Sequence, residues 1–155
     1  MKKNLIFASL LALSLPLTTL AQKAVKSRPL DGYFLKSSVK DAEEKPYVWV
    51  FNDQASFENA FGTATKAGSK TMTINFEKES VVALAAPKTK VPTMLSMTVA
   101  QKGSTVMVKY KMKPESDKES FVRRPVTLVA IPKSVATGKE VVVYDNNQEV
   151  QRIER

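Results

Sequence analysis

Ser37 and Lys40 form a Ser-x-x-Lys pattern, the spacing that some acyl-transfer enzymes use for a serine nucleophile and its lysine partner. That spacing works on a helix, where residues three apart share one face. Here the pair follows Tyr33-Phe34-Leu35, an aromatic run typical of a strand, and no companion motif is present. We interpret both residues as ordinary loop residues, and the chain is predicted not to be an enzyme.

The composition removes most other catalytic devices. The 155 residues include no His and no Cys, which excludes disulfides, thiolate nucleophiles, Cys/His zinc sites and histidine bases. Lys and Arg number 24 against 15 Asp and Glu, so the formal net charge is +9. A hydrophobic share of 43% and a charged share of 25% fit an ordinary globular chain of one domain.

The acidic side chains gather in two polar segments that we expect to be loops. Solvated loop carboxylates lack the closed, apolar surroundings that separate the pKa values of a glycosidase pair. Neither segment has the alternating acidic ligands around a central Gly that a calcium loop requires, so no metal and no other cofactor is predicted. The residues concerned are Asp41, Glu43, Glu44, Glu115, Asp117 and Glu119.

The first 21 residues have the pattern of a secretory signal peptide. Lys2 and Lys3 precede an apolar run from Leu5 to Leu15, and small residues up to Ala21 provide a cleavage site before Gln22. The apolar run is shorter than a membrane-spanning helix, so no transmembrane segment is expected after cleavage. The sequence therefore predicts export to the periplasm or the medium. Losing two lysines would lower the net charge from +9 to +7.

The rest of the chain is predicted to be mostly strands. Residues 22–30 have no clean period and are interpreted as a flexible lead-in, so the single domain is expected to span residues 31–155. Runs of aromatic, β-branched or alternating apolar residues mark the strands, and turn residues separate them. The predicted strands are 33–35, 47–51, 81–86, 95–99, 106–112, 126–131, 141–144 and 150–153, of which 81–86 is interpreted as central because it is apolar on both faces.

One short helix is predicted over residues 54–61. Asp53 can accept hydrogen bonds from its first amides, Phe57 and Phe61 are expected to anchor it in the core, and Gly62 is expected to end it in the left-handed conformation. We find no internal repeat and no regular alternation of strands with helices. The predicted fold is a compact, mainly antiparallel α+β domain, with a sandwich or partly closed barrel as the alternative.

Basic and aromatic residues suggest two kinds of partner. Lys109, Lys111 and Lys113 alternate along one predicted strand and are interpreted as a solvent face or a charged edge. Export and the lack of a binding module argue against nucleic acid, and an acidic protein or an anionic polymer stays open. Trp49 is interpreted as a core residue, with carbohydrate stacking as the minority interpretation.

Two segments of the sequence are similar to one known family. Residues 74–83, Ile-Asn-Phe-Glu-Lys-Glu-Ser-Val-Val-Ala, and residues 124–133, Arg-Pro-Val-Thr-Leu-Val-Ala-Ile-Pro-Lys, follow a Phe-rich helix in the same order. In this order the chain resembles the protease-complex subunit PrcB family over about residues 50–145. Its members often carry a Pro-Thr-Gly-Gly-Tyr turn between these segments. Here Pro92 and Thr93 match, but Met94 and Leu95 replace the glycines.

The resemblance implies a noncatalytic accessory subunit that associates with and stabilises a secreted or envelope protease. We therefore expect an exported protein-interaction domain, and the alternative is a periplasmic module that binds a small ligand or a glycan. The contact surface is expected where the loops before two predicted strands meet at one end of the sheet. Its predicted residues are Lys88, Lys90, Pro92, Thr93, Met94, Phe121, Arg123 and Arg124.

Overall fold

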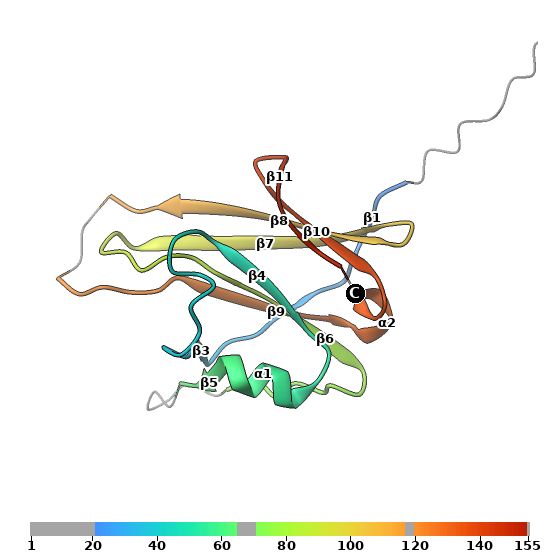
Figure 1. Cartoon of the computed structure of the whole chain (residues 1–155), viewed down its shortest axis with the longest axis horizontal. Helices are drawn as coiled ribbons and strands as arrows, with labels where there is room; N and C mark the ends of the chain where they lie inside the picture. Colours follow the sequence, from blue (N-terminus) through green and yellow to red (C-terminus); the bar gives the residue numbers. More distant parts are fainter. Residues whose placement is uncertain (1–20, 65–70, 117–119, 155) are drawn as a thin grey trace, which may run out of the picture.

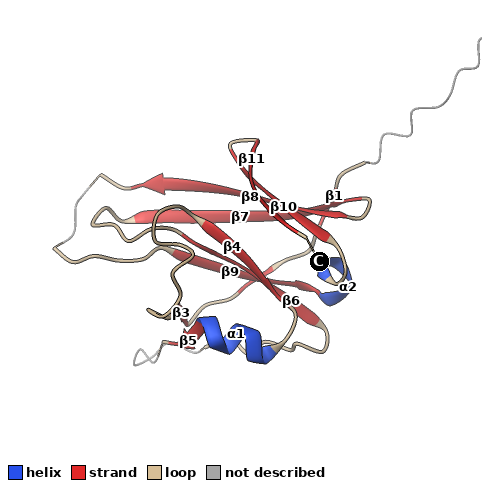
Figure 2. Ribbon diagram, viewed as in Figure 1, coloured by secondary structure: helices blue, strands red, loops and turns tan. Residues whose placement is uncertain are grey.

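A computed structural model describes residues 21–64, 71–116 and 120–154. The predicted signal peptide, apart from Ala21, lies outside these residues. The elements in chain order are β1 (Lys23–Ala24), β2 (Arg28–Pro29), β3 (Tyr33–Leu35), β4 (Tyr47–Phe51), α1 (Gln54–Ala60), β5 (Phe61–Thr63), β6 (Glu79–Ala85), β7 (Thr93–Lys102), β8 (Thr105–Pro114), β9 (Val126–Pro132), α2 (Lys133–Ala136), β10 (Glu140–Asp145) and β11 (Gln148–Ile153). The predicted α+β class, mainly antiparallel, is confirmed, and Figure 2 shows how strongly strands dominate.

Two sheets form most of the fold (Figure 1). Sheet A has the order β1-β7-β8-β10-β11, and sheet B has the order β2-β9-β6-β4. A third, two-stranded sheet pairs β3 with β5. Every strand pair within the described residues is antiparallel except β8 with β10, which run parallel. This arrangement corresponds to the sandwich alternative, with an additional layer over sheet B.

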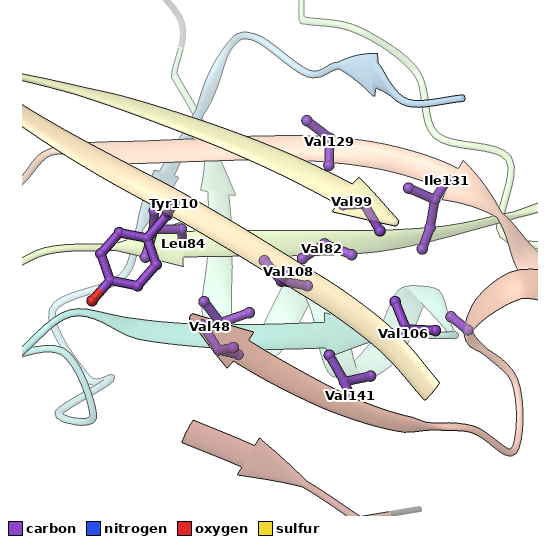
Figure 3. Packing of buried hydrophobic residues seen from close by; sticks show 12 residues of the cluster. Val48, Val82, Leu84, Val99, Val106, Val108, Tyr110, Val129, Ile131 and Val141 are labelled. Atoms are coloured by element: carbon purple, nitrogen blue, oxygen red, sulfur yellow. The ribbon is translucent and has the colours of Figure 1, made fainter. Parts of the chain in front are cut away.

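Apolar residues of β6, β8, β9 and β10 form the core between the two sheets. Val106 and Val108 of β8 face Val129 and Ile131 of β9, with Val82 of β6 between them (Figure 3). All five are nearly or fully buried. Because a strand exposes alternate residues to each face, β8 leaves Lys109 and Lys111 on the outside of sheet A.

Strand β6 is covered on both faces, as the continuous apolar run predicts. Val82 and Leu84 contribute to the core between the sheets, whereas Val81 and Ala83 face the opposite side. All of its residues from Ser80 to Ala85 are fully buried. The prediction of a central strand is confirmed, since β6 lies between β4 and β9.

The other face of sheet B is covered by α1 and the β3–β5 pair. Asp53 caps the helix by accepting a hydrogen bond of 2.8 Å from the Ser56 amide, as predicted. Phe57 and Phe61 are 3% and 2% exposed and stack at 5.3 Å, so their predicted core role is also confirmed. Trp49 of β4 packs edge-on against Phe61 on this side.

The predicted role of Gly62 is wrong. The helix ends one residue earlier, at Ala60, and Phe61 and Gly62 continue as the extended strand β5. Gly62 is needed for a different reason, because it lies opposite Phe34 in the β3–β5 pair. A Cβ atom on Gly62 would be only 2.6 Å from the ring of Phe34, so the aromatic ring occupies the space of the missing side chain.

The predicted lead-in at residues 22–30 is part of the fold. Lys23 and Ala24 pair with Gln101 and Ala100 of β7 in sheet A. Five residues later, β2 pairs with β9 in sheet B, and Leu30 is 4% exposed. The segment crosses from one sheet to the other, and the boundary predicted at residue 31 is therefore too late. Because this segment pairs with strands that are distant in the sequence, its apolar and polar residues show no local periodicity.

Where β11 and β4 form the edges of the two sheets, the side chain of Gln151 connects sheet A to sheet B. The Gln151 amide of β11 donates to the Val48 carbonyl at 2.9 Å and accepts from the Val48 amide at 3.0 Å. Val48 lies on β4, the edge strand of sheet B, so this amide substitutes for a missing neighbouring strand.

The turn into β11 uses Asn146 and Asn147, both with positive φ, as a tight hairpin requires.

Candidate functional site

The loops that carry the predicted contact residues meet at one end of the sandwich. Between β6 and β7, Thr89 exchanges two backbone hydrogen bonds with Arg123, which precedes β9, at 2.8 and 2.9 Å. The Ala86 amide also donates to the Pro125 carbonyl at 3.0 Å. These bonds bring residues about 35 positions apart into one surface, which we call the loop cluster: residues 87–94 and 121–125. The two loops therefore meet, which is the condition under which Phe121, Arg123 and Arg124 join the predicted contact surface.

Apolar side chains project from the loop cluster into solvent. Met94 is 62% exposed, and Phe121 and Val122 are each 52% exposed. The Arg123 guanidinium lies 4.5 Å from the centre of the Phe121 ring, a cation–π contact. Large apolar side chains that gather on one exposed surface indicate a contact site more than single ones do. Sequence reasoning missed Val122, although it lies between two predicted residues.

A groove runs between the two loops. Its volume is about 390 Å³. Residues of both loops line it, among them Pro92, Met94, Arg123, Arg124 and Val126. The Glu115 amide donates to the Pro92 carbonyl at 2.7 Å and holds the end of β8 against the loop. Within the described residues, the buried Nη1 of Arg124 has no hydrogen-bond partner.

The loop cluster is positively charged. Lys88 and Lys90 are exposed on the first loop, and Arg123 and Arg124 lie on the second. Glu43, from the loop before β4, lies close enough to respond to them. The hydrogen bond from Lys40 lowers the pKa of the Glu43 carboxyl, and the positive charges of Arg124 and Lys88 lower it further.

The other candidate residues lie elsewhere. Ser37 is exposed in a turn after β3, and the Lys40 ammonium is 2.9 Å from the Glu43 carboxylate. Trp49 lies against Tyr47 at 4.8 Å and is half-buried in the aromatic cluster beside α1. Glu44 and Glu115 are exposed, while Asp117 and Glu119 lie outside the described residues. No three acidic residues of the described ranges are grouped as a metal site would require.

The predicted lysine stripe lies on the outer face of sheet A. Lys109 and Lys111 of β8 line a hollow of about 560 Å³ with Ser96 and Thr98 of β7. Asn147 also lines the hollow and accepts a hydrogen bond of 3.3 Å from the Lys109 ammonium. The stripe is a solvent face, as predicted, and β10 flanks β8 only as far as Tyr110, so Lys111 and Lys113 lie on a part of β8 that pairs with β7 alone among the described strands.

Comparisons with protein families, with curated proteins and with solved structures find no match for this chain. Within the described residues, no helix has the length and apolar character needed to cross a membrane.

Proposed function

We propose that this chain is an exported, noncatalytic protein-interaction domain that serves as an accessory subunit of a secreted or envelope protease. The observation that carries the proposal is the loop cluster. It presents Met94, Phe121 and Val122 to solvent on loops that backbone hydrogen bonds hold together. Exposed apolar residues next to charged ones are typical of a protein contact, which combines a central apolar area with a polar rim.

The partner surface should be acidic and partly apolar. The same two loops carry four cationic residues, Lys88, Lys90, Arg123 and Arg124, together with the exposed apolar residues. Complementary charge steers association and discriminates between partners. The N-terminal signal pattern supports export, and the resemblance of residues 50–145 to the PrcB family supports a protease as the partner. The glycan alternative depends on Trp49, whose ring is occupied by contacts with Tyr47 and Phe61.

The test is recovery of the full chain, tagged at its C-terminus, from envelope and culture fractions of its native host. A loop-cluster variant combines Lys90→Glu, Met94→Ser and Phe121→Ser. A matched control carries Lys78→Glu, Met72→Ser and Val150→Ser, three exposed positions away from the loop cluster. Bound proteins are identified by mass spectrometry at low and high salt.

We expect a stoichiometric protease with the wild type and the control, and at least about tenfold less with the loop-cluster variant. Equal recovery with both variants would reject the loop cluster as the contact surface. If no protein partner is recovered with the wild type, the accessory-subunit function is wrong and a ligand-binding module becomes the better proposal.

A further inference from the structure

Strands β7 and β8 extend beyond the other strands of sheet A. β1 pairs with β7 only at Gln101 and Ala100, although β7 begins eight residues before Gln101, at Thr93. On the other side, β10 ends opposite Tyr110. The two long strands therefore project as a ribbon toward the loop cluster (Figure 1). Along residues 93–98, β7 is an edge strand.

The free backbone groups of this edge can be assigned from the ladder. The Val25 amide donates to the Val99 carbonyl at 3.0 Å, so the backbone polar groups of Val99 face β1. Because these groups alternate in direction along a strand, those of Met97 and Leu95 face the same side. No described residue donates to or accepts from them on that side. Such an unpaired edge is a template for another strand.

The side chains around this edge define what could pair with it. Leu95 and Met97 are half-buried against the core between the sheets. On the outer face, Ser96 and Thr98 are small and lie opposite Lys111 and Lys109 in the β7–β8 register. An added strand would therefore place one set of side chains beside apolar residues. Its alternate set would lie beside the hollow that the two lysines line.

We propose that the edge of β7 at residues 93–98 accepts an extended segment of the partner as an added strand, with apolar side chains alternating with acidic ones. This mode of binding rests on the proposed function and gives it a geometry: main-chain hydrogen bonds supply affinity, and the alternate side chains supply specificity. The edge begins at Thr93 and Met94, so the added strand is continuous with the loop cluster.

Charge complementarity selects an acidic partner over a second copy of this chain. Edge-to-edge pairing of two β7 strands would bring together two ribbons that both carry positive charge, on Lys109 and Lys111 of β8, and like charges oppose such self-association. An acidic strand meets the same lysines with the opposite charge. Its affinity must therefore fall as salt increases, because the lysines are exposed to solvent.

The probe is a fluorescein-labelled peptide of alternating Glu and Val, eight residues long, titrated onto the full chain and followed by fluorescence anisotropy. A peptide of the same composition with the order scrambled is the control. We expect the alternating peptide to bind at least about tenfold more tightly. On binding, the Leu95 and Met97 amides should become protected from hydrogen exchange, whereas the Ser96 amide, which faces β8, is protected throughout.

Two variants distinguish the contribution of backbone hydrogen bonds to peptide binding from the contribution of charge. Met97→Pro removes an amide that faces the open edge and leaves the ladder to β8 intact. Lys111→Glu reverses one charge of the hollow and is compared with Lys78→Glu, whose side chain lies away from β7. We expect each of the first two variants to weaken binding by about tenfold and Lys78→Glu to have no effect. Circular dichroism and thermal unfolding verify that each variant is folded.

Three results would overturn the inference. They are absence of binding, equal binding of the scrambled peptide, or a wild-type dimer in sedimentation that Met97→Pro converts to a monomer. The same variants in the recovery experiment separate this inference from the proposed function. If the loop-cluster variant loses the protease but Met97→Pro and Lys111→Glu retain it, the function stands and strand addition is wrong. If the wild type recovers no protease although the peptide binds the β7 edge, the function is wrong and the edge is a genuine strand acceptor.

Discussion

The edge strands β4 and β7 differ in whether their outward-facing backbone groups are hydrogen-bonded within the fold. On β4, the backbone amide and carbonyl of Val48 are both satisfied by the side-chain amide of Gln151, which reaches across from sheet A. On β7, the corresponding groups of Leu95 and Met97 have no partner among the described residues. The open stretch begins at Thr93 and Met94 of the loop cluster and pairs with the part of β8 that carries Lys109 and Lys111. The fold therefore closes one edge with its own residues and leaves free the edge that is best placed for a partner.

The largest difference in stability is expected between substitutions of two leucines, one next to each edge strand. Leu84 of β6 is fully buried next to β4, whereas Leu95 of β7 is half-buried near the open end. Leu84→Ala should lower the free energy of unfolding by about 2–5 kcal/mol, because it leaves a cavity in a closed core. Leu95→Ala should cost clearly less. Urea unfolding of both variants measures the difference, and equal losses would show that the end of β7 is as closed as the centre.

The closed edge should depend on one amide. Gln151→Leu leaves the buried Val48 amide and carbonyl without partners, so the free energy of unfolding should fall by about 1–3 kcal/mol. Gln148→Leu is the matched control, since Gln148 is exposed at the start of the same strand. Thermal and urea unfolding supply the measurement. If the two variants are equally stable, the Gln151 bonds do not close this edge.

A smaller loss of stability is expected when the ion pair between β2 and β6 is removed. The Arg28 guanidinium of β2 binds the Glu79 carboxylate of β6 with contacts of 2.8 and 2.9 Å. Partial burial alone would raise the pKa of Glu79, but hydrogen bonds from the Asn75 amide and Arg28 outweigh it and lower the pKa. Because Arg28 is substantially exposed, Glu79→Gln should cost less than about 1 kcal/mol at pH 7.

The pH dependence gives the sign of this contribution. A carboxyl whose pKa is lowered by folding stabilises the protein above its unfolded pKa, about 4.3 for Glu, and loses that effect as pH falls through the folded pKa. The stability difference between wild type and Glu79→Gln should therefore be full at pH 6–7 and shrink below about pH 4. A difference that grows on acidification would contradict this assignment.

The smallest stability effect is expected at the open edge itself. Lys111→Ser replaces an exposed side chain that makes no ion pair with any described residue, so stability should stay within about 0.5 kcal/mol of the wild type. Binding of the acidic peptide should nevertheless weaken severalfold. Paired unfolding and anisotropy measurements test both halves. A large loss of stability would show that Lys111 maintains the fold rather than contacting a partner.

The sequence predicted the elements whose signals are local. The apolar run of β6, the alternation of the β7–β8 hairpin and the Asp53 cap each depend on neighbours in the chain, and all three are confirmed. The pairing of β1 and β2 was missed because two-residue strands are fixed by distant partners. Gly62 was misassigned for the same reason, since the residue that requires it is Phe34, across a sheet.

The candidate site was predictable in part. The loop residues could be selected by charge and apolarity, but the Thr89–Arg123 bridge that joins them depends on long-range register. The open edge of β7 could not be inferred, because it results from where β1 and β10 end. The sequence does show a strand of alternating apolar and polar residues next to a row of lysines, but this pattern is typical of a solvent face as well as of a binding edge.

The most direct test is hydrogen–deuterium exchange of the full chain, free and in the recovered complex with its partner. We predict that complex formation protects residues 87–98 and 121–125, the loop cluster with the adjoining edge of β7, and leaves β4 and β11 unchanged. Protection centred on Trp49 and α1, or on β11, with no change at the loop cluster, would contradict it.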